Sequence, residues 1–126
     1  MNNEYKNKMN ELIENIKAWG INKGITGTNG KGTLLGQLNK TQEELTETRD
    51  AAMKWILCYG HGDYKRAMSE QLMDGIGDCT VTLILAAELA GLDFQECVQF
   101  AYDEIKGRTG AMVDGQFVKD SNQQKP

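Results

Sequence analysis

Acidic residues gather at two places in the sequence at helical spacing. Glu43, Glu44 and Glu47 form an E-E-x-x-E cluster, and Asp74 and Asp78 lie one helical turn apart further along the chain. Glu44 and Glu47 are neighbours on one flank of a helix, and like charges at this spacing repel. Because exposed glutamates are common on helices, the first cluster by itself is also explained by a solvated surface.

The two aspartates give the stronger signal. Their helix face continues as Val81, Leu85 and Leu89, so both are expected to project toward the core. A buried carboxylate without a partner is costly, and two of them opposite a second acidic cluster require a cation. Oxygen ligands without His or Cys favour Mg²⁺, or Mn²⁺, over Zn²⁺. The sequence therefore predicts a Mg²⁺ site; a frayed helix that leaves Asp74 in water is the alternative.

Four helices are expected to position these residues, because apolar side chains recur every three or four positions. The predicted helices cover about residues 4–19, 34–57, 64–89 and 94–106, with a glycine-rich loop at 20–32. From Gly107 onward we expect a loop and then disorder. The third helix is apolar nearly all round over 76–92, which indicates coverage by neighbouring helices and by a second subunit.

The predicted fold class is therefore all-α, a compact helical bundle of four main helices completed by oligomerisation. A chain of 126 residues fits one domain, which we expect over residues 1–119, followed by a polar, disordered tail at 120–126. Gly75 and Gly77 interrupt the third helix beside the aspartates. Close approach of a ligand, or tight packing against a large side chain such as Trp55, would explain them.

Composition narrows the partners and the compartment. The formal net charge of −4 argues against binding to a nucleic-acid duplex. Cys58, Cys79 and Cys97 are far apart and are interpreted as reduced core thiols. The N-terminus has no apolar segment, and the longest apolar run, 81–92, is too short to span a bilayer. We expect a cytoplasmic protein without a membrane partner.

These acidic segments and their flanks resemble the MazG-like nucleotide pyrophosphohydrolases, in particular short, phage-type members. The resemblance extends over roughly residues 12–119. It is carried by Trp19 with Lys23-Gly24-Ile25, by Gln37-x-x-Lys40-Thr41-x-Glu43-Glu44-x-x-Glu47, by Asp74-Gly-Ile-Gly-Asp78-x-x-Val81, and by the segment from Tyr102 to Lys119. The order of these segments is more specific than any one of them.

The resemblance implies a Mg²⁺-dependent helical homodimer or homotetramer that hydrolyses a nucleoside triphosphate, ribo or deoxyribo, to the monophosphate and pyrophosphate. It assigns metal ligation to Glu44, Glu47 and Asp78, and makes Glu43 a further ligand or a water-orienting base. The family's second motif, E-x-x-D, has a glutamate where Gly75 stands here. We expect Asp74, on the same helix face as Asp78, to supply the missing carboxylate.

The expected mechanism follows from charge. Water held by the metal and by Glu43 or Glu47 attacks a phosphorus in line, and Mg²⁺ stabilises the departing pyrophosphate. Cations are needed for the remaining phosphate charge. The candidates are Lys40, one turn before Glu44, and Lys106, Arg108 and Lys119 in the C-terminal segment.

Two other readings compete with this one. Gly27–Thr33 looks like the ATP-binding loop of Mur-type ligases, which would require a strand that ends near Ile25. A non-catalytic metal-binding helical oligomer is the second alternative. His61 is expected to be exposed in a glycine loop. Trp19 and Trp55 are expected in the core, with base stacking as an alternative for Trp19.

Overall fold

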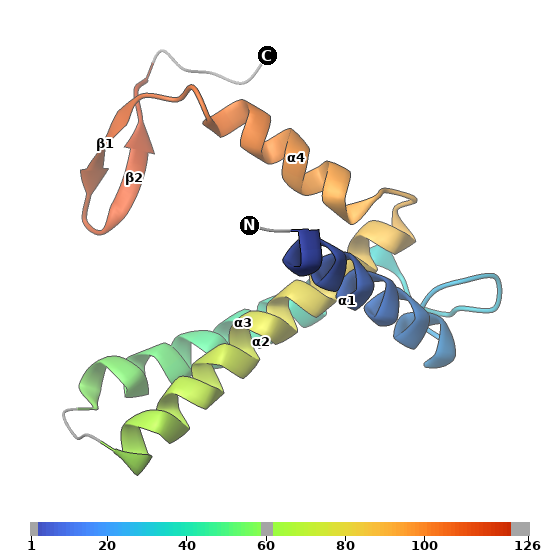
Figure 1. Cartoon of the computed structure of the whole chain (residues 1–126), viewed down its shortest axis with the longest axis horizontal. Coiled ribbons are helices and arrows are strands. Elements are labelled where there is room, and N and C mark those ends of the chain that lie inside the picture. Colours follow the sequence, from blue (N-terminus) through green and yellow to red (C-terminus); the bar gives the residue numbers. More distant parts are fainter. Residues whose placement is uncertain (1–2, 59–61, 122–126) are drawn as a thin grey trace. The chain divides into compact units, whose positions relative to one another are not determined.

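The chain is all-α, as its sequence predicts, and its described residues form four helices and one small β-hairpin (Figure 1). The computed structural model describes residues 3–58 and 62–121. The elements are α1 (Asn3–Asn22), α2 (Leu34–Leu57), α3 (Asp63–Leu89), α4 (Phe94–Ile105), β1 (Gly110–Val113) and β2 (Gln116–Lys119). All four predicted helices are present, and their ends agree with the predictions within a few residues.

The chain divides into two compact units, Met1–Phe94 and Gln95–Pro126. The boundary falls inside the segment for which one domain is expected. The first unit holds α1, α2, α3 and Phe94, which is the first residue of α4. The second unit holds the remainder of α4 and the hairpin. We describe each unit by itself.

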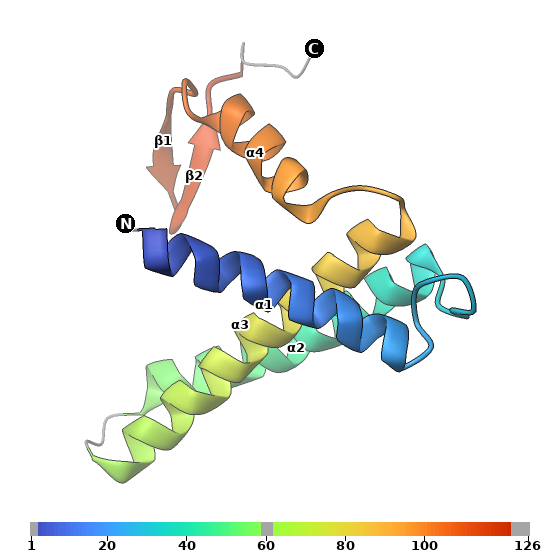
Figure 2. The same ribbon diagram turned by 45° about the vertical axis from the view of Figure 1, so that its right-hand side comes forward.

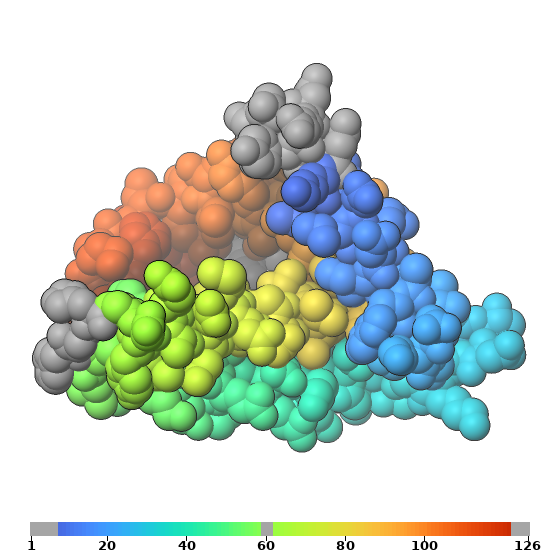
Figure 3. All heavy atoms as spheres, turned by 60° about the horizontal axis from the view of Figure 1, so that its bottom comes forward, coloured from blue at the N-terminus to red at the C-terminus, as the bar shows by residue number. Residues whose placement is uncertain are grey.

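Helices α2 and α3 run antiparallel and pack along their length (Figure 3). Small residues at the interface allow the close approach. Thr41 Oγ1 donates to Thr82 Oγ1 over 2.8 Å. Two helical turns further along, the backbone of Gly75 lies against Thr48, and Ala51 is buried beyond it. The separation of Thr41 and Thr48 along α2 equals that of Gly75 and Thr82 along α3, so the two contacts belong to one continuous register of the helix pair.

Helix α1 packs across α3 through a second close contact (Figure 2). A Cβ at Gly20 would lie 2.5 Å from Leu85 Cδ2, so only glycine fits there without displacing that side chain. Leu85 and its neighbour Ile84 are the largest fully buried side chains of the described residues, and Ile13 of α1 is buried as well. The core of the first unit therefore lies where α1 meets α3.

Local signals fix the ends of two helices. Thr33 caps α2, because its side-chain oxygen accepts a hydrogen bond from the Gly36 amide at 3.0 Å. Gly91, with φ +70°, ends α3 as the sequence predicts. The following amide, from Leu92, returns to the Ala87 carbonyl over 2.9 Å. This hydrogen bond satisfies a carbonyl that the helix end would otherwise leave open.

The loop predicted after Gly107 is wrong, because residues 110–119 form an antiparallel hairpin. Strands β1 and β2 are joined by Asp114 and Gly115, whose φ values of 50° and 81° are those of a two-residue hairpin turn. An Asp-Gly pair between two apolar runs is a strong hairpin signal, so the sequence did contain this information.

The first residue of the predicted disordered tail is held in place. Asp120 accepts a hydrogen bond from Thr109 Oγ1 at 2.7 Å, and its amide donates to the Thr109 carbonyl over 3.1 Å. These bonds close the open end of the hairpin. Residues 122–126 of the predicted tail lie outside the described residues.

Within the described part of the first unit, the neighbouring helices cover only one side of α3. Leu85 and Ala87 are buried, whereas Ile76 and Leu83 remain 57% and 43% exposed. The second unit has no buried residue in α4, β1 or β2. Within the described residues no single helix is long and apolar enough to cross a membrane; only the bent pair α3 and α4 qualifies, by length and composition.

Candidate functional site

Glu44 of α2 and Asp78 of α3 meet on the wall of one cavity. The hydrogen bond between Thr41 and Thr82 sets their position, because Glu44 follows Thr41 by one turn and Asp78 precedes Thr82 by one turn. In antiparallel helices these two steps lead in the same direction. The E-E-x-x-E cluster and the aspartate helix are therefore brought together, as the sequence predicts, but through one residue from each.

The Asp78 carboxyl has an unfavourable environment for its charge. Burial raises its pKa above the ordinary value, and the negative charges of Asp74 and Glu44 raise it further. The positive charge of Lys40 acts in the opposite direction and is the smallest of the four causes. Asp78 thus lacks the compensating charge that a partly buried carboxylate normally has.

Lys40 is a cation on the same cavity wall as the acidic pair. Its Nζ lies 3.2 Å from Glu43 Oε2 and 3.6 Å from Glu44 Oε1. The Glu44 side chain is only 13% exposed, whereas that of Glu43 is 66% exposed. The hydrogen bond to Glu43 is the main cause that raises the pKa of Lys40. Lys40 therefore stays charged beside the cavity at any physiological pH.

Asp74 and Glu47 are exposed. The prediction that both aspartates project into the core is wrong for Asp74, because α1 covers α3 nearer to its C-terminal end. Asp74 instead borders a groove of about 610 Å³ between α1 and α3, whose wall also includes Asp78 and apolar side chains such as Leu12 and Met73. Its charge still acts on Asp78.

No three His, Cys, Asp or Glu residues of the described chain are grouped closely enough to enclose a metal ion. The predicted set of Glu44, Glu47, Asp74 and Asp78 is therefore not assembled as one cage. Glu44 and Asp78 remain as a carboxylate pair. Mg²⁺ is commonly held by one or two carboxylates together with waters and substrate phosphates. Two carboxylates on one wall match this partial ligation by protein, and they do not match a cation enclosed by protein alone.

The cavity beside the pair has a volume of about 450 Å³. All three helices of the first unit and the glycine-rich loop contribute to its wall. The side chains that define it are those of Trp19, Ile25, Gln37, Lys40, Glu44 and Asp78. Val81, Thr82 and Leu85 of α3 also line it, so the cavity combines an aromatic ring, several apolar side chains, an amide, a cation and two carboxylates.

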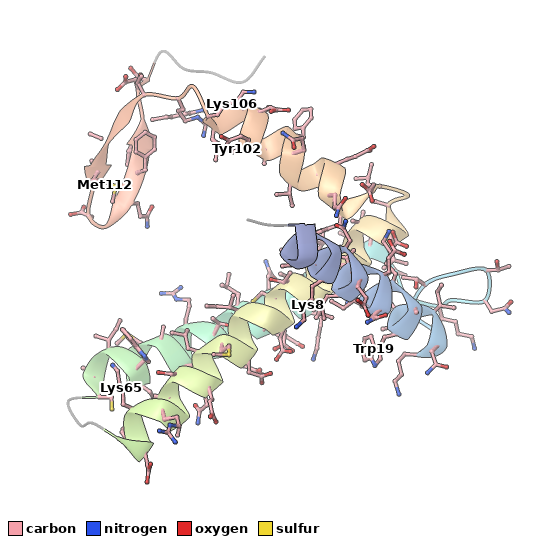
Figure 4. The ribbon with its side chains drawn as sticks, viewed as in Figure 1. Lys8, Trp19, Lys65, Tyr102, Lys106 and Met112 are labelled. Atoms are coloured by element: carbon pink, nitrogen blue, oxygen red, sulfur yellow. The ribbon has the colours of Figure 1, made fainter. Side chains whose placement is uncertain are left out.

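The prediction that both tryptophans lie in the core is wrong. Trp19 is 47% exposed and projects from α1 (Figure 4), and Trp55 is 37% exposed. Trp55 needs a partner for its indole N–H, which donates to Ser69 Oγ over 3.1 Å. The Lys65 ammonium lies 3.6 Å from the centre of the Trp55 ring and binds the Trp55 carbonyl. Trp55 is thereby held at the surface, away from the candidate site.

The glycine-rich loop does not have the setting of a phosphate-binding loop. Helix α1 extends to Asn22 and turns follow it, so no strand precedes the loop within residues 3–58. The loop folds onto itself instead. Lys31 N–H donates to the Gly24 carbonyl and Gly32 N–H to the Ile25 carbonyl, each over 2.9 Å. This pairing holds Ile25 at the cavity wall.

Gly75 is explained by helix packing. A Cβ at this position would lie 2.5 Å from Thr48 Oγ1 and 3.2 Å from Thr48 Cα. Tight packing was one of the two predicted explanations, although the neighbour is Thr48 and not Trp55. A glutamate at 75, as the family motif has, would not fit this interface. At Gly77 a Cβ would meet nothing within 4 Å, so packing does not explain that glycine.

The remaining candidates lie elsewhere. Lys106, Arg108 and Lys119 belong to the second unit, where Lys106 pairs with Asp103 at 3.1 Å. Their role in phosphate binding stays a prediction. The three cysteines form no disulfide bond within the described residues, and each is partly buried rather than in the core where the sequence predicts them. His61 lies outside the described residues.

Sequence reasoning gave no role to Gln37, although its amide lines the cavity. A signal was available: Gln37, Lys40 and Glu44 follow one another at intervals of three and four, which places them on one helix face. Comparison of the chain with known protein families, with curated proteins and with solved structures finds no match. The family resemblance therefore rests on the sequence motifs alone.

Proposed function

We propose that this protein is a Mg²⁺-dependent nucleoside triphosphate pyrophosphohydrolase, which converts an NTP or dNTP and water to the monophosphate and pyrophosphate. The observation that supports it best is the convergence of Glu44, Asp78 and Lys40 on one cavity. The raised pKa of Asp78 adds to this, because perturbed carboxyls in a cleft are typical of functional sites.

The charge of each residue indicates its role in the proposed reaction. Glu44 and Asp78 would hold the metal, which supplies charge neutralisation on the phosphate oxygens and a more acidic bound water. Glu43 or Glu47, both exposed beside Glu44, orients the attacking water and accepts its proton. Lys40 exchanges its present carboxylate partners for a phosphate oxygen.

The experiment is a screen of all common NTPs and dNTPs, with Mg²⁺ or Mn²⁺, in which pyrophosphate and orthophosphate are measured separately. We expect pyrophosphate and a nucleoside monophosphate in equal amounts, and no reaction when the metal is chelated. Release of orthophosphate alone would indicate a different phosphatase. Binding of Mg²⁺ without turnover of any nucleotide would favour the non-catalytic metal-binding oligomer.

A further inference from the structure

We propose that the cavity next to Glu44 seats the nucleobase, with Trp19 as the stacking surface and Gln37 as the side chain that reads the base edge. This inference rests on the proposed function, in which Lys40, Glu44 and Asp78 take the phosphate end of the same molecule. It assigns the substrate's base to a site inside the first unit of the chain.

One wall of the cavity is aromatic. Trp19 lines the cavity and is 47% exposed, so a large part of its indole surface is not used for packing within the described chain. A partly exposed indole beside a hollow of about 450 Å³ can accept a flat heteroaromatic ring. Such stacking is tolerant of base identity, because every base has a π face.

Another part of the cavity wall carries the side-chain amide of Gln37. Gln37 is partly buried, and in the described part of the chain its side-chain amide has no hydrogen-bond partner. An amide offers an acceptor and two donor hydrogens in one plane, which match a neighbouring donor and acceptor on a base edge. A ligand without that edge leaves the amide unpaired and is rejected.

Three polar side chains follow one another along α2 in the order that a nucleotide requires. Gln37, Lys40 and Glu44 lie on one face, and Gln37 is about 10 Å from Glu44 along the axis at the rise of an α-helix. An uncharged amide, a cation and a carboxylate thus follow one another over a distance comparable to the reach of an extended nucleotide. Base, phosphates and metal would lie in the same order.

The glycine-rich loop contributes Ile25 to the wall of the cavity. Ile25 N–H donates to the Gly20 carbonyl over 2.9 Å, which ties the loop to the end of α1. A Cβ at Gly32 would lie 2.6 Å from the Ile25 carbonyl oxygen, so the loop closes tightly upon itself. Ile25 is therefore a fixed apolar contact and not part of a mobile segment.

The test uses the fluorescence of Trp19. The chain has two tryptophans, so Trp55→Phe leaves Trp19 as the single indole reporter. Nucleoside monophosphates with each base are titrated into this variant with Mg²⁺, and ribose 5-phosphate serves as the abasic control. We expect saturable quenching by at least one monophosphate and none by ribose 5-phosphate. Trp19→Ala in the natural chain should weaken monophosphate binding, measured by calorimetry, by about tenfold or more.

Base specificity is tested by adding Gln37→Leu to the Trp55→Phe variant. We expect the ratio of dissociation constants between the best and worst base to fall toward one, while Gln37→Glu changes which base binds best. Gln42→Leu, an exposed glutamine on the same helix, is the control and should leave the ratio unchanged.

The outcomes separate this proposal from the proposed function. Pyrophosphate release without any quenching by monophosphates would overturn the base site and leave the hydrolase intact. Base-dependent quenching in a protein that hydrolyses nothing would support the base site and reject the hydrolase. Equal quenching by ribose 5-phosphate and by the monophosphates would also overturn the base site.

Discussion

Asp78 is a carboxyl whose surroundings oppose its own ionisation. Burial and the charges of Asp74 and Glu44 all act to raise its pKa, and only Lys40 offsets them. A folded-state pKa above the unfolded value means that the folded chain binds the proton more tightly. Ionised Asp78 therefore destabilises the fold at neutral pH, and this penalty disappears as the pH falls through the raised pKa. A divalent cation would remove it without a change of pH.

The corresponding prediction concerns Asp78→Asn in the absence of divalent metal. We expect this variant to melt a few degrees above the natural chain at neutral pH, with a difference that shrinks as the pH falls through the raised pKa. Millimolar Mg²⁺ should stabilise the natural chain and not the variant. Thermal unfolding followed by circular dichroism measures both effects. A variant that melts lower at neutral pH without metal would contradict the assigned environment.

Asp74 is predicted to supply the carboxylate that the MazG-like motif has at the position of Gly75. It is exposed, yet its charge reaches Asp78. If Asp74 acts as a ligand in the complex with metal and nucleotide, Asp74→Asn should lower kcat by about tenfold or more, since removal of one ligand charge weakens transition-state stabilisation. Steady-state kinetics with saturating Mg²⁺ is the measurement. Glu70→Gln, one turn earlier in the same groove, is the matched control. Full activity of Asp74→Asn would remove Asp74 from the site.

At the scale of elements, the site depends on the register between α2 and α3. The Thr41–Thr82 hydrogen bond and the Gly75–Thr48 contact lie two turns apart and enclose the segment that carries Glu44 and Asp78. A shift or separation of these helices would move the two carboxylates apart. Gly75 therefore serves the site by allowing the helices to approach, without touching a ligand itself.

The pair Gly75→Ala and Gly77→Ala tests this packing. At Gly75 the added methyl group would collide with Thr48, so we expect a loss of about 1–3 kcal/mol in the free energy of unfolding. At Gly77 the space is open, so the better helix propensity of alanine should add up to about 1 kcal/mol. Urea denaturation gives both values. Equal effects of the two substitutions would show that the helices do not meet closely at Gly75.

The four helices could be predicted because their periodicity and their stop signals, such as Gly91, are local. The hairpin could also have been predicted from Asp114-Gly115, and the polar character of the tail obscured it. The placement of Asp74 and Trp19 could not be predicted, because it depends on how far α1 covers α3. Helical spacing assigns a residue to a face, but it does not say which neighbour covers that face. For the same reason, helical spacing does not indicate that Glu44 and Asp78 line one cavity, whereas Asp74 lines the neighbouring groove and Glu47 lines neither.

At the scale of the whole molecule, each of the two units, taken by itself, leaves many apolar side chains of its described residues exposed. Ile76 and Leu83 of α3 are exposed, and so are Phe100 of α4 and Phe117 of β2. A twelve-residue helix and a two-stranded hairpin without buried residues are marginal by themselves. Exposed apolar surface of this extent is typical of chains that associate.

We therefore expect a symmetric oligomer, at least a dimer, at micromolar concentration. Sedimentation velocity should give at least twice the chain mass of 14.0 kDa. Leu83→Glu places a charge on the exposed side of α3 and should shift the population toward monomer. Lys54→Glu, which alters an exposed charged residue of α2, is the control. A well-folded natural chain that sediments as a monomer would contradict this expectation.

The central claim is that Glu44 and Asp78, from two helices, act as one unit in Mg²⁺-dependent hydrolysis of a nucleoside triphosphate. A double-mutant cycle on kcat/KM with Glu44→Gln and Asp78→Asn tests it most directly. Each single change should lower kcat/KM by about a hundredfold or more, and the double change should cost little beyond either one. Independent, multiplicative losses, or single variants with the activity of the natural chain, would contradict the account.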